Sequence, residues 1–92
     1  MKTIISTKDH LISVEINGNI SKTTRAFYNK AGHVSGYKTT FHSCDICDMH
    51  EVFVSVVLSI DRKIAEGFSI VEMDKTVGVH EGVTVTYVAC RK

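Results

Sequence analysis

The chain has 92 residues, of which 43% are hydrophobic and 23% charged, and its formal net charge is +1. This length provides for one hydrophobic core and excludes a second domain, while the composition excludes an intrinsically disordered chain. The longest apolar stretch, residues 52–60, is much shorter than the roughly 20 residues that cross a bilayer. The apolar run at Ile4 and Ile5 is too short for a signal peptide. We therefore expect one domain over residues 1–92, located in the cytoplasm.

The first part of the chain predicts β-strands. Apolar and polar residues alternate over residues 10–16, which is typical of a half-buried strand. The apolar face of this strand would carry Ile12, Val14 and Ile16. Asn17-Gly18 follows directly and is a strong signal for a tight hairpin turn. Ile4 and Ile5 are expected to belong to a preceding strand that turns at Lys8-Asp9.

Residues 21–41 are polar but rich in threonine and aromatic side chains, which favour strands. Residues 29–32 have the composition of a turn, so we predict a second hairpin here that projects from the core. A short helix over residues 23–30, ending at Gly32, is the competing interpretation.

The next segment predicts a long amphipathic helix. Apolar side chains recur there at spacings of three and four, and polar side chains repeat the same spacing on the opposite face. The apolar face comprises Ile46, Met49, Phe53, Val57, Ile60 and Ile64, and the polar face Asp48, Glu51, Ser55, Ser59, Arg62 and Glu66. Asp48 with Glu51 would cap the start, and Gly67 would end the helix. Over residues 51–60 apolar residues also alternate, so a strand is the competing interpretation there.

The last part of the chain predicts two closing strands. Residues 68–73 and 83–90 are rich in β-branched residues, and Gly78 and Gly82 between them mark a loop. Taken together, the predicted elements give an α+β fold, in which a small antiparallel sheet packs on one long amphipathic helix.

A cysteine pair is the sharpest candidate for chemistry. Cys44 and Cys47 are three residues apart, a spacing that lets two thiolates reach one metal ion, and His42 and His50 flank them. A structural zinc site would need a distant ligand, for which Cys90 or His80 are the candidates. This predicts an alternative function, a small zinc-stabilised nucleic-acid-binding regulator.

The sequence contains none of the common motifs of an enzyme active site. The chain has no Gly-x-Ser-x-Gly, no glycine-rich phosphate loop and no spacing typical of a catalytic carboxylate pair. Asp45, between the two cysteines, places a negative charge where a redox dithiol needs a stabilised thiolate. We therefore expect no enzyme, no cofactor and no small-molecule substrate.

The charges are distributed unevenly. Residues 1–44 carry six Lys or Arg against two Asp or Glu, and residues 45–92 carry five against eight. The basic part also contains tyrosines, and cations with aromatic rings suit the phosphates and bases of a single-stranded nucleic acid or a ribonucleoprotein. The candidate binding residues are Lys22, Arg25, Tyr28, Lys30, His33 and Lys38. A solvated β-face, whose lysines guard a sheet edge against aggregation, is the alternative interpretation.

The chain as a whole, most clearly residues 1–10 and 83–92, resembles a phage-encoded anti-CRISPR protein of the type I-F group. The resemblance implies a non-enzymatic inhibitor that acts in the bacterial host against antiviral defence. Such an inhibitor binds the guide-RNA-loaded surveillance complex, through Cas subunits and sometimes the guide RNA, and blocks target DNA hybridisation. Anti-CRISPR proteins share no common motif, so the resemblance assigns no role to any single residue.

Overall fold

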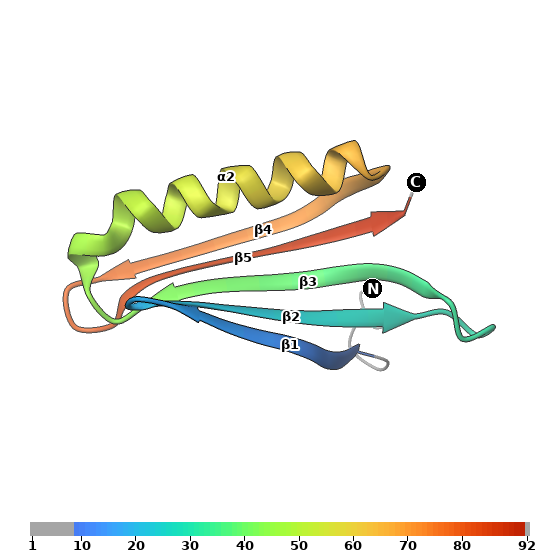
Figure 1. Ribbon diagram of the computed structural model, residues 1–92, viewed down its shortest axis with the longest axis horizontal. Coiled ribbons are helices and arrows are strands. Elements are labelled where there is room, and N and C mark those ends of the chain that lie inside the picture. Colours follow the sequence, from blue (N-terminus) through green and yellow to red (C-terminus); the bar gives the residue numbers. More distant parts are fainter. Residues whose placement is uncertain (1–8, 92) are drawn as a thin grey trace.

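The computed structural model describes residues 9–91, which form a five-stranded antiparallel sheet with one helix packed on it (Figure 1). The elements in chain order are β1 (Asp9–Asn17), β2 (Ile20–Tyr28), β3 (Val34–Ser43), the 3₁₀ helix η1 (Ile46–Asp48), α2 (Met49–Ala65), β4 (Phe68–Gly78) and β5 (Gly82–Arg91). The strand order is β1-β2-β3-β5-β4, so β1 and β4 are the two edges. The predicted α+β fold is confirmed, whereas the strand expected at Ile4 and Ile5 lies outside the described residues.

The hairpin predicted at Asn17-Gly18 is present. Asn17 pairs with Ile20, which leaves a two-residue turn of Gly18 and Asn19 between β1 and β2. Gly18 has a φ of 63°, and no other residue in this turn has a positive φ. This is the pattern of a type II′ turn, whose twist matches that of the strands it joins.

Residues 20–43 form the second predicted hairpin, so the competing helix over residues 23–30 is wrong. Its turn is held by Asn29, whose Oδ1 accepts hydrogen bonds from the backbone N–H groups of Ala31 (2.9 Å) and His33 (3.0 Å). The prediction that this hairpin projects from the core is also wrong. β2 and β3 lie inside the sheet, and Phe27 and Phe41 are buried.

The core lies between α2 and one face of the sheet, which we call the helix side; the other face is the open side. α2 packs against β3, β4 and β5. The buried cluster comprises Phe41, Val52, Val56, Phe68, Val83, Val85, Tyr87 and Ala89. A strand at residues 51–60 is therefore wrong and the predicted helix is confirmed. Within residues 9–91 no helix is long and apolar enough to cross a membrane.

The ends of the helical region differ partly from the prediction. Gly67 follows the helix with a φ of 98°, as expected for its end. The predicted capping pair is wrong, because the Asp48 side chain makes no capping hydrogen bond and instead accepts one from Ser43 Oγ at 2.7 Å. Asp45 caps η1 one turn earlier, by accepting a hydrogen bond from the Cys47 N–H at 2.9 Å.

The face of α2 that enters the core is rotated relative to the predicted one. Val52 and Val56 are the buried residues of the helix, while Val57, expected inside, is 57% exposed. Ser59, expected in solvent, lies against the core and hydrogen-bonds Tyr87. The observed buried face is rotated from the predicted one by less than the roughly 100° that separates consecutive residues around a helix.

The prediction that residues 10–16 form a half-buried strand is right about the strand and wrong about its burial. Leu11, Ile12, Val14 and Ile16 are all exposed. β1 is an edge strand, and α2 covers the other half of the sheet. The register also shifts between Leu11 and Ser13, so a β-bulge at Ile12 breaks the alternation that the sequence suggests.

Candidate interaction surfaces

The structure divides the six candidate binding residues among three places. Lys22 lies on the helix side, where its Nζ is 5.8 Å from the centroid of the Phe41 ring. Arg25 and Lys38 are cross-strand partners on the open side. Because successive residues of a strand point to opposite faces, Lys22 and Arg25 cannot join one surface.

The remaining three candidates lie at the tip of the β2–β3 hairpin. Lys30 and His33 are exposed in the turn, and Tyr28 ends β2. The Tyr28 ring packs against His10 of β1, with 5.4 Å between the ring centroids. The tip therefore presents a cation and an imidazole next to a partly exposed aromatic ring.

The open side of the sheet changes in charge from one edge toward the other. Lys38 of β3 pairs with Val88, which in turn pairs with Glu72 of β4. Lys38, Glu72 and Asp74 line a common hollow of about 160 Å³, together with Thr86 and Val88. The cations of β2 and β3 are thus followed across the sheet by carboxylates on β4.

Further along the β3–β5 ladder, beyond Val88, the open side is neutral and polar. Thr40 of β3 and Thr86 of β5 share a hydrogen bond of 3.1 Å between their hydroxyls. Two residues further along β3, His42 Nδ1 lies 2.8 Å from Thr84 Oγ1. These hydrogen bonds connect the side chains of β3 and β5 across the open side. The alternating Thr84 and Thr86 of β5 are the sequence signal that could have predicted them.

The cysteines of the alternative metal site lie at the start of the helical region. Cys44 and Cys47 are exposed, and Cys44 Sγ is 3.6 Å from His42 Nε2. Cys90 cannot complete this site, because it lies at the opposite end of the β3–β5 ladder, where it pairs with Gly36. Within the described part of the chain, no three His, Cys, Asp or Glu side chains come together in a way that could hold a metal ion.

Two of the three cysteine thiols, those of Cys47 and Cys90, have a raised pKa. The hydrogen bond between the Cys47 thiol and the Asp45 carboxylate raises the pKa of Cys47, and the negative charge of Asp45 adds to this effect. Burial raises the pKa of Cys90. A redox dithiol needs a thiol with a lowered pKa, so the environment of Cys47 is unfavourable for that chemistry.

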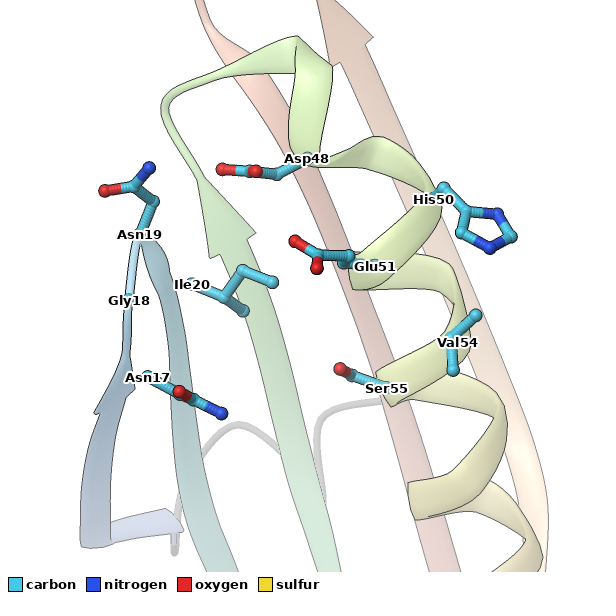
Figure 2. Close-up of a pocket in the computed structure, with 9 residues that line it drawn as sticks. All are labelled: Asn17, Gly18, Asn19, Ile20, Asp48, His50, Glu51, Val54 and Ser55. Carbon is cyan, nitrogen blue, oxygen red and sulfur yellow. The ribbon is translucent and has the colours of Figure 1, made fainter.

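Two grooves flank the side of α2 that faces β1 and β2. The larger, of about 590 Å³, lies between the β1–β2 turn and the first turns of the helix. Figure 2 shows Glu51 and Ser55 directed from the helix toward Ile20 and the turn. The smaller groove, of about 220 Å³, continues along the same side of α2; its lining residues are Lys22, Phe41, Ser55, Leu58, Ser59 and Arg62.

A third groove, on the other side of α2, is almost entirely apolar. It has a volume of about 310 Å³, runs between the helix and edge strand β4, and is lined by Phe53, Val56, Val57, Ile60, Met73, Lys75 and Val85. Val57 and Met73 are more than half exposed. The Nζ atom of Lys75 lies 5.4 Å from the centroid of the Phe53 ring and places a cation at the rim.

Exposed apolar side chains are concentrated on α2 and on both edge strands. The large ones are Leu11, Ile12, Val14 and Ile16 on β1, Met49, Val54, Val57, Leu58 and Ile64 on α2, and Val71, Met73 and Val77 on β4, with Val79 just after it. The sequence analysis missed these apolar surfaces, although apolar residues outside the predicted helix stripe, such as Val54 and Leu58, were a usable signal.

Comparison of the chain with protein-family models, with curated proteins and with solved structures finds no match.

Proposed function

We propose that this chain is a non-catalytic inhibitor that binds the guide-RNA-loaded type I-F CRISPR-Cas surveillance complex and blocks target DNA hybridisation in the bacterial cytoplasm. The resemblance of residues 1–10 and 83–92 to a type I-F anti-CRISPR protein suggests this partner. The structural observation that supports a docking role is the apolar groove between α2 and β4, with exposed Val57 and Met73 at its lining.

Such a surface favours a protein partner. Large contiguous apolar patches on a folded chain mark sites of protein interaction, because leaving them in water is unfavourable. Among the strands of residues 9–91, β4 is also an edge with a neighbour on one side, so a partner could add a strand on the other. We assign the Cas-subunit contact to this α2–β4 surface.

A contact with the guide RNA would use a different surface. At the hairpin tip, Lys30 offers a cation for phosphates, and the His33 imidazole and the Tyr28 ring offer surfaces for bases. Arg25 and Lys38 extend the basic surface along the open side. Lys22 lies on the other face, so we leave it out of the RNA-proximal set.

The test of the function is co-elution of the purified chain with a type I-F surveillance complex, followed by a target-DNA binding assay on the mixture. Stable co-elution with loss of DNA binding is the expected result. Co-elution with DNA binding intact would move the inhibited step to one after hybridisation. Failure to co-elute would reject the proposed partner.

Matched lysine variants test the RNA contact. Lys30→Gln and Lys38→Gln should each weaken binding and reduce the slope of the logarithm of the binding constant against the logarithm of the salt concentration by about one. Lys22→Gln, with the same loss of charge, should change neither the affinity nor the slope. Met73→Gln should weaken the complex without changing that slope, because it replaces an apolar side chain of the α2–β4 surface without adding a charge. If Lys22→Gln has the largest effect, the assignment of the RNA-proximal face is wrong.

A further inference from the structure

Cys44, His42 and Thr84 form a chain of polar contacts at the end of the open side where β3 ends. Cys44 Sγ lies 3.6 Å from His42 Nε2, and His42 Nδ1 lies 2.8 Å from Thr84 Oγ1. The His42 ring therefore has a partner at each of its two nitrogens. Cys44 is exposed, so a small molecule in solution can reach its sulfur atom. A thiol, a base and a group that orients the base, in this order, are the elements of an activated cysteine.

The sheet fixes the positions of these three residues. His42 and Thr84 lie opposite each other in the β3–β5 ladder, and both strands have a neighbour on each side. Cys44 directly follows the last residue of β3, and its backbone lies against Gly82, where a Cβ atom would be 2.8 Å from the Cys44 Cα. The contact between the thiol and the imidazole is thus supported by two interior strands.

The two contacts of the His42 ring suit it to accept the thiol proton. A neutral imidazole carries a proton on one nitrogen, whereas the protonated ring donates from both. After the Cys44 proton has moved to Nε2, one N–H of the ring donates to the Cys44 thiolate and the other to Thr84 Oγ1. Both N–H groups then have an acceptor, so the surroundings stabilise the products of the proton transfer.

We propose that Cys44 is a site of covalent modification by small disulfides, at which His42 acts as the general base and Thr84 positions the His42 ring. The Cys44 sulfur attacks one sulfur of a disulfide RSSR while His42 Nε2 takes the thiol proton. The S–S bond of RSSR breaks, and the leaving RS⁻ takes the proton from the imidazolium as RSH. Cys44 then carries an SR group in a mixed disulfide. RSSR is the oxidant, and no other reactant is needed.

The neighbouring cysteine is poorly suited to displace the bound group. The hydrogen bond to Asp45, together with the charge of Asp45, raises the pKa of the Cys47 thiol, so little thiolate is present to attack the mixed disulfide at Cys44. Cys90 lies at the other end of the β3–β5 ladder, opposite Gly36. The modification therefore lasts until an external thiol reduces it.

The modification site does not depend on the function proposed above. It lies at the opposite end of β3 from the hairpin tip, because that strand begins beside the tip at Val34 and ends at Ser43. None of its three residues lines the α2–β4 groove. Its test measures a reaction at Cys44 in the isolated chain and needs no surveillance complex, so either proposal can fail without the other.

The test is the rate at which oxidised β-mercaptoethanol, a small neutral disulfide, forms a mixed disulfide at each cysteine of the folded chain at pH 7. Proteolysis before Asp45 places Cys44 and Cys47 on separate peptides for mass spectrometry. We expect Cys44 to react faster than Cys47 and Cys90. A Cys44 that reacts no faster than these two would overturn the proposal.

His42→Gln tests the base. A thiol without such help is only roughly 3% ionised at pH 7, so we expect the rate at Cys44 to fall about tenfold in this variant. His50→Gln is the matched control, because His50 is exposed on the first turn of α2 and should leave the rate unchanged. An unchanged rate in His42→Gln, or an equal fall in His50→Gln, would overturn the proposal. Cys90 reports on the fold; if its rate rises in His42→Gln, the Thr84 variants decide.

Two substitutions at Thr84 test its positioning role. Thr84→Val keeps the shape of the side chain and removes the hydroxyl, whereas Thr84→Ser keeps the hydroxyl and removes the methyl group. We expect Thr84→Val to slow the reaction of Cys44 severalfold and Thr84→Ser to react as the wild type does. Equal rates in the two variants would mean that the hydroxyl does not position His42, and would overturn the proposed chain of contacts.

Discussion

The Ser59 hydroxyl of α2 hydrogen-bonds the Tyr87 hydroxyl of β5, and the Tyr87 ring is fully buried beneath the helix. The pair satisfies two polar groups inside the core and fixes how α2 is rotated against the sheet. A buried hydroxyl without a partner is costly, whereas replacing both partners by apolar groups can be nearly neutral.

Removing both hydroxyls should therefore cost less than the sum of the costs of removing each one alone. We expect Tyr87→Phe and Ser59→Ala each to lower the free energy of unfolding by about 1–2 kcal/mol, and the double variant to lower it by less than the sum. Urea denaturation of the four proteins gives this coupling. Additive losses would show that the two hydroxyls act independently.

Lys63 contributes to the core through its charge as well as its stem. Its Nζ lies 4.0 Å from the centroid of Tyr37 and 5.4 Å from that of Phe68. We expect Lys63→Met, which keeps the apolar stem, to cost about 0.5–1 kcal/mol and Lys63→Ala to cost more. The 3.5 Å ion pair with Glu66 is a surface pair, so Glu66→Gln should cost at most about 0.5 kcal/mol. A loss in Glu66→Gln equal to that in Lys63→Met would assign the effect to the ion pair.

The position of Ser59 explains why the helix could be predicted from the sequence while its buried face could not. Periodicity finds an α-helix and its end at Gly67 from local residues alone. It places Ser59 on the outward face, because the periodicity contains no information on the Tyr87 hydroxyl across the interface, to which Ser59 hydrogen-bonds. The exposure of β1 likewise depends on where α2 lies over the sheet, and the alternation of residues 10–16 gives no information on that position.

The candidate binding surface, too, could be predicted from the sequence only in part. The residue types for binding could be chosen from the sequence, but grouping them needed the register of the strands. Lys22 and Arg25 are three residues apart in a strand, so period-two geometry already separates them. The two grooves on the β1–β2 side of α2 could not be predicted, because their walls come mainly from residues 17–22 and 48–62, whose approach is set by the sheet order.

Gly82 occupies a position that no other residue can take without distortion. Its φ is 82°, and a Cβ atom there would lie 2.0 Å from the carbonyl oxygen of Ser43. Gly32 has a similar φ of 86° with no atom within 4 Å of its Cβ position, which makes it a matched control. We expect Gly32→Ala to cost about 1–2 kcal/mol from backbone strain alone. Gly82→Ala should cost about 1–3 kcal/mol more, because β5 must move away from β3.

Thermal or urea unfolding of the two glycine variants measures this difference. The amide hydrogen exchange of Gly82→Ala should also rise at the end of the β3–β5 ladder where Ser43 pairs with Val83. Equal losses in the two variants would contradict the close approach of Gly82 to Ser43.

The reactivity of Cys47 should respond to a single neighbouring carboxylate. Its hydrogen bond to Asp45, strengthened by the charge, raises the pKa of the Cys47 thiol, so less thiolate is present at a given pH. Asp45→Asn removes the charge and keeps an oxygen that can accept from the Cys47 N–H, so η1 should persist. We expect the pH at which Cys47 is half alkylated by iodoacetamide to fall in this variant, and its rate at mildly alkaline pH to rise.

Peptide mass spectrometry separates the cysteines in this experiment. Cys90 is the internal control, because burial and not Asp45 raises its pKa, and its alkylation should be the same in both proteins. A parallel rise at Cys90 would indicate a loosened fold in place of a local charge effect. If the rate at Cys47 stays unchanged while Cys90 remains protected, the Asp45 carboxylate does not hold the thiol protonated, and the contact at the start of η1 is wrong.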